Sequence, residues 1–176
     1  MSTRTLFCTL LAAAALAAGA VPASAHITLA VREAKLGGSY LATLRIPHGC
    51  AGAATTAVSV RIPAGVYGVK PMPKAGWQLK VDSGKYDAPF ANRGEMLTEG
   101  VTTVTWSGGN LPDAFYEEFV LSTSLADSLS PGKPIYFPVV QQCEGGKVDR
   151  WIEIPAAGKV ADDYQTPAPG LMILPK

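Results

Sequence analysis

Eight segments of the chain have the residue pattern of β-strands. Apolar and polar side chains alternate in the clearest of them, as expected for strands that place one face on a core. The segments cover residues 27–31, 40–46, 57–62, 77–81, 101–106, 115–123, 135–140 and 150–154. Turns rich in glycine and proline separate them, and no stretch keeps a helical period for long. The pattern therefore predicts an all-β fold, an immunoglobulin-like antiparallel sandwich of about eight strands.

The two ends of the chain lack this pattern. Residues 1–25 have the parts of a secretory signal peptide: Arg4, an apolar run over 6–20, and Ala23-Ser24-Ala25 before a cleavage point. We predict cleavage after Ala25, export to the periplasm, and a mature chain that begins with His26. Residues 156–176 contain several prolines and glycines with little periodicity, so we expect a C-terminal tail along the surface. A single domain is then predicted over residues 26–155.

Charge and hydropathy exclude two classes of partner. The chain has 15 basic and 14 acidic residues. Because cleavage removes only Arg4, the mature chain has a formal charge near zero, which gives no electrostatic support to nucleic-acid binding. After Ala25 no apolar run approaches the roughly 20 residues that cross a bilayer, so no membrane span is expected in the mature chain.

Two cysteines remain after the predicted cleavage, Cys50 and Cys143. An even pair in an exported chain predicts a disulfide bond. The alternative is a thiolate copper site made by the same two residues. With the cysteines paired, few side chains remain as candidates for catalysis or metal binding, and the only histidines are His26 and His48. This composition disfavours a Ser-His-Asp triad or a three-histidine zinc site, and no P-loop or Rossmann glycine motif is present.

His26 changes its chemistry when cleavage makes it the first residue. Its free α-amine and its imidazole Nδ1 then form a chelate of two nitrogen donors. Nitrogen donors in a near-planar arrangement favour Cu(II), which also leads the affinity order of the divalent first-row ions. The alternative is a histidine that follows the signal peptide by chance.

Several motifs resemble the YcnI-like family. The resemblance runs from His26 to about Pro155 and depends on the order and spacing of the motifs. They are Ala25-His26, Arg45-Ile46-Pro47-His48-Gly49-Cys50, Ala54-Thr55-Thr56-Ala57, Lys74-Ala75-Gly76-Trp77, Thr105-Trp106-Ser107-Gly108-Gly109, Leu111-Pro112-Asp113, Glu118-Phe119, Tyr136-Phe137-Pro138-Val139-Val140-Gln141, Cys143-Glu144-Gly145-Gly146 and Trp151.

The resemblance implies a periplasmic copper-binding domain with a mono-histidine brace. It assigns the amine and imidazole to His26, a carboxylate ligand to Glu118, and a shielding tryptophan to Trp151, with one Cu(II) per chain. Strand period alone leaves Glu117 as a competitor for the carboxylate, because neighbouring strand residues point to opposite faces. His48 stands where the family more often has asparagine, and we expect it to be a solvent-facing turn residue.

The expected function is copper binding and handover without enzymatic activity, as part of copper homeostasis. A site with few protein ligands suits a chaperone, since open coordination positions let an incoming ligand bind the copper ion before the protein's own ligands leave. The partners would be other periplasmic copper chaperones or a CopC/CopD-type importer. One alternative is an oxidative copper enzyme of the lytic polysaccharide monooxygenase type, which needs His48 as a second histidine. Another is a non-catalytic scaffold domain in which His26 is incidental.

Overall fold

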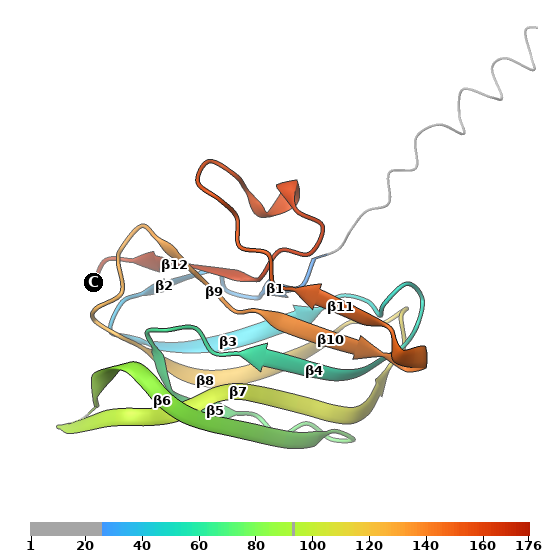
Figure 1. Ribbon diagram of the computed structural model, residues 1–176, viewed down its shortest axis with the longest axis horizontal. Helices are drawn as coiled ribbons and strands as arrows, with labels where there is room; N and C mark the ends of the chain where they lie inside the picture. The colour runs from blue at the N-terminus through green and yellow to red at the C-terminus, as the bar shows by residue number, and fades with distance from the viewer. Residues whose placement is uncertain (1–25, 93) are drawn as a thin grey trace, which may run out of the picture.

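The computed structural model describes residues 26–92 and 94–176, so the predicted signal peptide lies outside the described residues. Two β-sheets face each other and a smaller sheet closes one side (Figure 1). The first sheet has the order β1 (Thr28–Leu29), β3 (Ser39–Ile46), β8 (Glu117–Leu125), β5 (Val66–Pro71). The second has the order β11 (Val148–Trp151), β10 (Val139–Cys143), β4 (Thr55–Arg61), β7 (Glu95–Leu111), β6 (Gln78–Asn92). The predicted all-β, immunoglobulin-like sandwich is thus confirmed.

The smaller sheet joins the two ends of the domain. Its order is β2 (Glu33–Lys35), β12 (Gly170–Leu174), β9 (Pro134–Tyr136), with β2 and β12 parallel. All other strand pairs are antiparallel. Two short 3₁₀ turns, η1 (Glu144–Gly146) and η2 (Ala161–Asp163), complete the elements.

The core lies between the inner faces of the two large sheets. Along β3 the even-numbered residues from Tyr40 to Ile46 are buried, and their odd-numbered neighbours are more exposed. Phe119 and Leu121 of β8 continue this face, opposite Val58 and Trp106 of the second sheet. This is the alternation that the sequence pattern predicted, because successive side chains of a strand point to opposite faces.

The structure has twelve strands in its described part, more than the eight that were predicted. Strand β5 was not predicted because Gly68 and Pro71 interrupt the pattern of its apolar residues. The predicted strand 135–140 divides into β9 and β10 at Phe137-Pro138, since proline has no N–H to donate to a sheet. The β6–β7 hairpin is much longer than the two strands predicted there. The sequence did not reveal its outer part, because that part is solvated and shows no regular alternation of apolar and polar residues.

The prediction of a surface tail is wrong for the end of the chain. Leu171 and Ile173 have no exposed surface, and β12 pairs with both β2 and β9. Pro167 and Pro169 precede this five-residue strand and Gly170 begins it, so pattern analysis did not predict it. Residues 156–163 are exposed, as expected, and belong to a loop between β11 and β12. Figure 1 shows this β11–β12 loop (residues 152–169) above β1 and β12. The domain therefore extends to β12.

Candidate metal site

His26 stands two residues before β1, where the first sheet begins. Strand β1 pairs with β3 so that Thr28 faces Arg45. Continuing this antiparallel register by two residues brings His26 opposite Pro47, the neighbour of His48. The start of β1 and the turn that follows β3 (residues 47–50, the His48 turn) are therefore adjacent.

Both histidines lie against one indole ring, that of Trp151 at the end of β11. The ring centroid of His26 is 6.1 Å from that of Trp151, and the centroid of His48 is 6.2 Å from it. Each imidazole is inclined by 63° to the indole, which is an edge-to-face arrangement. Trp151 is only 3% exposed. The structure thus brings together two of the predicted site residues, His26 and Trp151, and adds His48.

His48 is half-buried, which differs from the expected solvent-facing position. The difference arises from Gln141 of β10, whose side chain is completely buried. Gln141 Nε2 donates to the carbonyl oxygen of His48 and to Thr55 Oγ1, each at 2.7 Å. Its Oε1 accepts the indole N–H of Trp151 at 3.0 Å. One amide therefore holds both the His48 turn and the indole that this turn meets.

Three further interactions fix the His48 turn. The N–H of Gly49 donates to Asp113 Oδ1 at 3.0 Å, and Cys50 exchanges two backbone hydrogen bonds with Ala53. Position 49 requires glycine because a Cβ there would collide with the carbonyl oxygen of Ala53. The predicted disulfide between Cys50 and Cys143 is present and ties the turn to the end of β10. Because both sulfurs are bonded to each other, these cysteines present no thiolates.

The two carboxylates considered for the site are bound by cations. Glu118 Oε1 lies 2.7 Å from Arg45 Nε, and Arg45 is on β3, the strand between β8 and β1. Glu117 Oε1 lies 2.9 Å from Lys74 Nζ and also accepts the N–H of Glu118. Burial raises the pKa of Glu117, but the N–H of Glu118 and the ammonium of Lys74 outweigh it and hold this pKa below its ordinary value.

The carboxylate beside His26 is a different one, Asp162 in η2. Its Oδ1 lies 3.8 Å from His26 Nδ1, and its side chain is 93% exposed. The β11–β12 loop carries Asp162 and is anchored by Glu153, whose carboxylate accepts the N–H and the hydroxyl of Thr166 at 2.8 Å. No sequence pattern pointed to Asp162, because it lies in the segment that was read as a tail.

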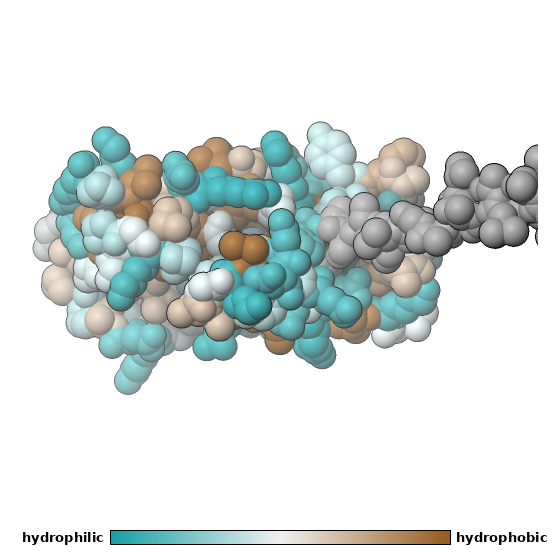
Figure 2. All heavy atoms as spheres, turned by 90° about the horizontal axis from the view of Figure 1, so that it is seen from above, coloured by the Kyte–Doolittle hydropathy of each residue, from teal (hydrophilic) through white to brown (hydrophobic). Residues whose placement is uncertain are grey.

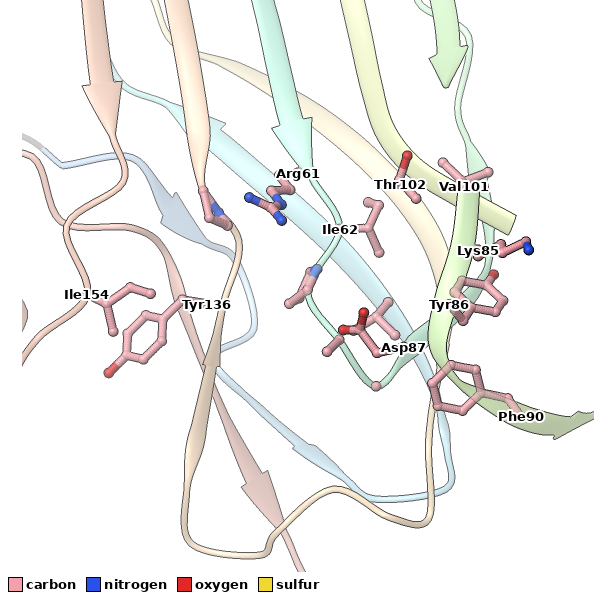
Figure 3. A pocket seen from close by; sticks show the side chains of 15 residues that line it. Arg61, Ile62, Lys85, Tyr86, Asp87, Phe90, Val101, Thr102, Tyr136 and Ile154 are labelled. Carbon is pink, nitrogen blue, oxygen red and sulfur yellow. The ribbon is translucent and has the colours of Figure 1, made fainter. Parts of the chain in front are cut away.

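A hollow of about 380 Å³ opens beside His26 and Asp162. Strands β1 and β12 and the β11–β12 loop wall it, with Arg32, Tyr136 and Met172 among the lining residues. The surface seen from above in Figure 2 is mostly hydrophilic with isolated apolar side chains. A second hollow of about 400 Å³, between Arg61, Tyr86 and Tyr136, contains none of the predicted site residues (Figure 3).

Side chains alone do not make a conventional metal site here. Within residues 26–92 and 94–176, no group of three or more His, Cys, Asp and Glu side chains is placed to hold a metal ion. The nearest donor groups are the imidazoles of His26 and His48 against Trp151 and the carboxylate of Asp162 beside His26. A metal ion held here by three or more ligands would therefore need a donor that is not a side chain, and cleavage after Ala25 would create such a donor, the α-amine of His26.

The central role of Gln141 leads to a stability prediction. Gln141→Leu keeps the side-chain volume but leaves three buried polar groups without their partner, so we expect the free energy of unfolding to fall by about 3 kcal/mol. The matched control is Gln142→Leu, at an exposed position on the same strand, where we expect a change within about 0.5 kcal/mol. Urea unfolding with the disulfide intact measures both. Equal midpoints for the two variants would contradict the role given to Gln141.

Comparison with known proteins places the domain in a family. No curated protein matches the chain. Three chains of solved structures match it. One is from a crystal structure of an uncharacterized protein from Nocardia farcinica, described as an immunoglobulin-like fold. It is 28% identical, has a TM-score of 0.62, and the alignment covers 85% of this chain and 98% of that one.

In the part of the chain that the structure describes, no helix is long and apolar enough to cross a membrane.

The family described as a domain of unknown function (DUF1775) matches residues 26–173. The match begins at His26, the residue that meets Trp151, and it reaches into β12. Because the match covers most of the chain, this protein belongs to the DUF1775 family.

Proposed function

We propose that this protein binds Cu(II) in the periplasm through the amine and imidazole of His26 and passes the ion to a partner. The observation that carries the proposal is the position of His26. Its ring lies 6.1 Å from the buried indole of Trp151, and the family match begins at this residue. Cleavage after Ala25 would add an amine at a place where the imidazole is already positioned.

The chemistry of this residue favours copper. The amine and Nδ1 of one histidine close a six-membered chelate ring, and Cu(II) is the divalent first-row ion that such nitrogen donors bind most strongly. The indole of Trp151 would cover one side of the site and limit the approach of water and other ligands. We therefore expect one Cu(II) per chain, with His26 as the principal ligand.

The resemblance and the geometry suggest different carboxylates. The resemblance assigns this role to Glu118, whose carboxylate is bound to Arg45 in the structure. Asp162 lies beside His26 on an exposed loop and has no other cation within ion-pair distance among the contacts of the described residues. We therefore propose Asp162 as the carboxylate ligand and keep Glu118 as the alternative.

A site of this kind suits handover better than storage. The 380 Å³ hollow beside His26 gives an incoming ligand access to the ion, and a carboxylate on an exposed loop can leave without disturbing the core. The acceptor or donor would be another periplasmic copper chaperone or a CopC/CopD-type importer. The second candidate function, an oxidative copper enzyme, is favoured only by the position of His48 beside Trp151.

The direct test of the proposal is a Cu(II) titration with electron paramagnetic resonance. One form of the protein begins at His26, and the control form has one extra alanine before it. We expect one tight equivalent with nitrogen hyperfine structure in the first form only, because the extension removes the amine from His26. If both forms bind alike, or neither binds, the proposed function is wrong.

The choice of carboxylate is tested by Asp162→Asn and Glu118→Gln in the form that begins at His26. We expect Asp162→Asn to weaken Cu(II) binding by about tenfold or more. Glu118→Gln should leave the affinity within about twofold, since its partner is Arg45. Thermal unfolding of both variants checks that the fold is intact. The reverse order of affinities would return the carboxylate role to Glu118.

A further inference from the structure

We propose that the hollow shown in Figure 3 binds a small organic carboxylate with an aromatic body. Its volume of about 400 Å³ lies in the range of small-ligand pockets, about 300–1,000 Å³. Residues 61–66 at the β4–β5 connection line it, together with β6 and β7 on one side and Tyr136 and Ile154 on the other. Neither His26 nor Asp162 takes part, so binding here needs neither copper nor the mature N-terminus.

An aromatic wall of the hollow is already formed in the protein. The rings of Phe90 and Tyr67 are stacked, with centroids 5.1 Å apart and planes 6° apart, and Tyr86 meets Phe90 edge-to-face at 5.1 Å. Tyr86 also lies over Gly100 of β7, where a Cβ would collide with the tyrosine hydroxyl. Because these rings support one another, a ligand would meet an ordered surface and lose little binding free energy to the ordering of side chains.

Strand β6 departs from regular pairing at this wall. Two pairs with β7, Lys85 with Glu99 and Phe90 with Leu97, enclose four residues of β6 (86–89) and a single residue of β7. Such bulges re-aim side chains and are over-represented next to active sites. Two of the bulged residues line the hollow. The irregularity of β6 therefore shapes this wall.

The charges at the hollow favour a monoanion. Within residues 26–92 and 94–176, the side chains of Arg61 and Lys85 form no ion pair and no hydrogen bond. Asp87 is the one carboxylate among the described lining residues, so two positive charges and one negative charge leave one positive charge. A carboxylate neutralises this charge, whereas a phosphate dianion would exceed it. The planar guanidinium of Arg61 matches a carboxylate through two parallel hydrogen bonds.

The wall opposite the aromatic rings leaves apolar surface uncovered. Ile154 is 59% exposed, although it lines the hollow. Figure 3 shows Ile154 and Tyr136 on one side, Tyr86 and Phe90 on the other, and Arg61 between the two sides. A polar anchor between apolar walls is the composition of a small-molecule pocket, and aromatic rings pack favourably on tyrosine and phenylalanine.

The competing explanation is that these cations are ordinary solvated side chains, which would attract every anion weakly. Nuclear magnetic resonance titrations of the metal-free, ¹⁵N-labelled protein that begins at His26 separate the two explanations. The probes are benzoate and phenylacetate, with phenylacetamide as the neutral analogue and acetate as the anion without a ring. The variants are Arg61→Gln and Lys85→Gln. The matched control is Arg150→Gln, at an exposed cation of β11 that does not line the hollow.

We expect saturable binding of at least one aromatic carboxylate, with the largest shifts in residues 62–65 and 86–89. Phenylacetamide and acetate should bind at least about tenfold more weakly than that carboxylate. Arg61→Gln should lower the affinity by about tenfold or more, because a hydrogen-bonded charge is lost. Lys85→Gln should weaken binding in the same direction, and Arg150→Gln should stay within about twofold. Tyr136 is left unchanged because it also lines the hollow beside His26.

Thermal unfolding checks that the variants fold, and Lys85→Gln provides the test if Arg61→Gln does not. Shifts that do not saturate, equal affinity for phenylacetate and phenylacetamide, or unchanged affinity in the folded variants would overturn the inference. Largest shifts around His26 would also overturn it, since they would place the ligand in the other hollow. Failure of the proposed function is separate, because it concerns the effect of the added alanine on Cu(II).

Discussion

The candidate site depends on the side-chain amide of Gln141. This amide is buried between the two sheets and makes three hydrogen bonds: it donates to His48 and Thr55 and accepts from Trp151. A buried amide is costly unless it is paired, so the network specifies one orientation of the indole and one position of the turn. Without it, Trp151 would be an ordinary core tryptophan and His48 an ordinary turn residue.

Other parts of the fold support this arrangement from a distance. The disulfide joins the turn after β3 to the end of β10, so the two segments that Gln141 bridges are also joined covalently. Strand β12 is the middle strand of the smaller sheet and has two fully buried side chains, and the β11–β12 loop that precedes it places Asp162 beside His26. The two imidazoles that meet Trp151 thus come from the sandwich, while the carboxylate beside His26 comes from an exposed loop.

The sequence predicted the parts of the fold that rest on alternation or on cysteine pairing. Strands β3 and β4 and the disulfide were found in this way, and His26 and Trp151 were placed in one site through the resemblance. Strand β12 was not predicted because its five residues follow prolines and show no alternation of apolar and polar positions. Asp162 could not be foreseen, since its place depends on how a long loop returns to the smaller sheet. The environment of His48 was missed because it is set by Gln141, which is 93 residues away.

The central claim is that copper binds beside Trp151, and the three indole N–H signals of the protein can test it together. Trp106 donates its N–H to the carbonyl oxygen of Met72, and Trp77 packs on Phe119, so each tryptophan has a distinct environment. Nuclear magnetic resonance of ¹⁵N-labelled protein that begins at His26 would follow these signals as Cu(II) is added. If copper binds as proposed, paramagnetic broadening will affect the Trp151 signal first and will be complete at one equivalent. Broadening that begins at Trp77 or Trp106, or equal persistence of all three signals, would contradict it.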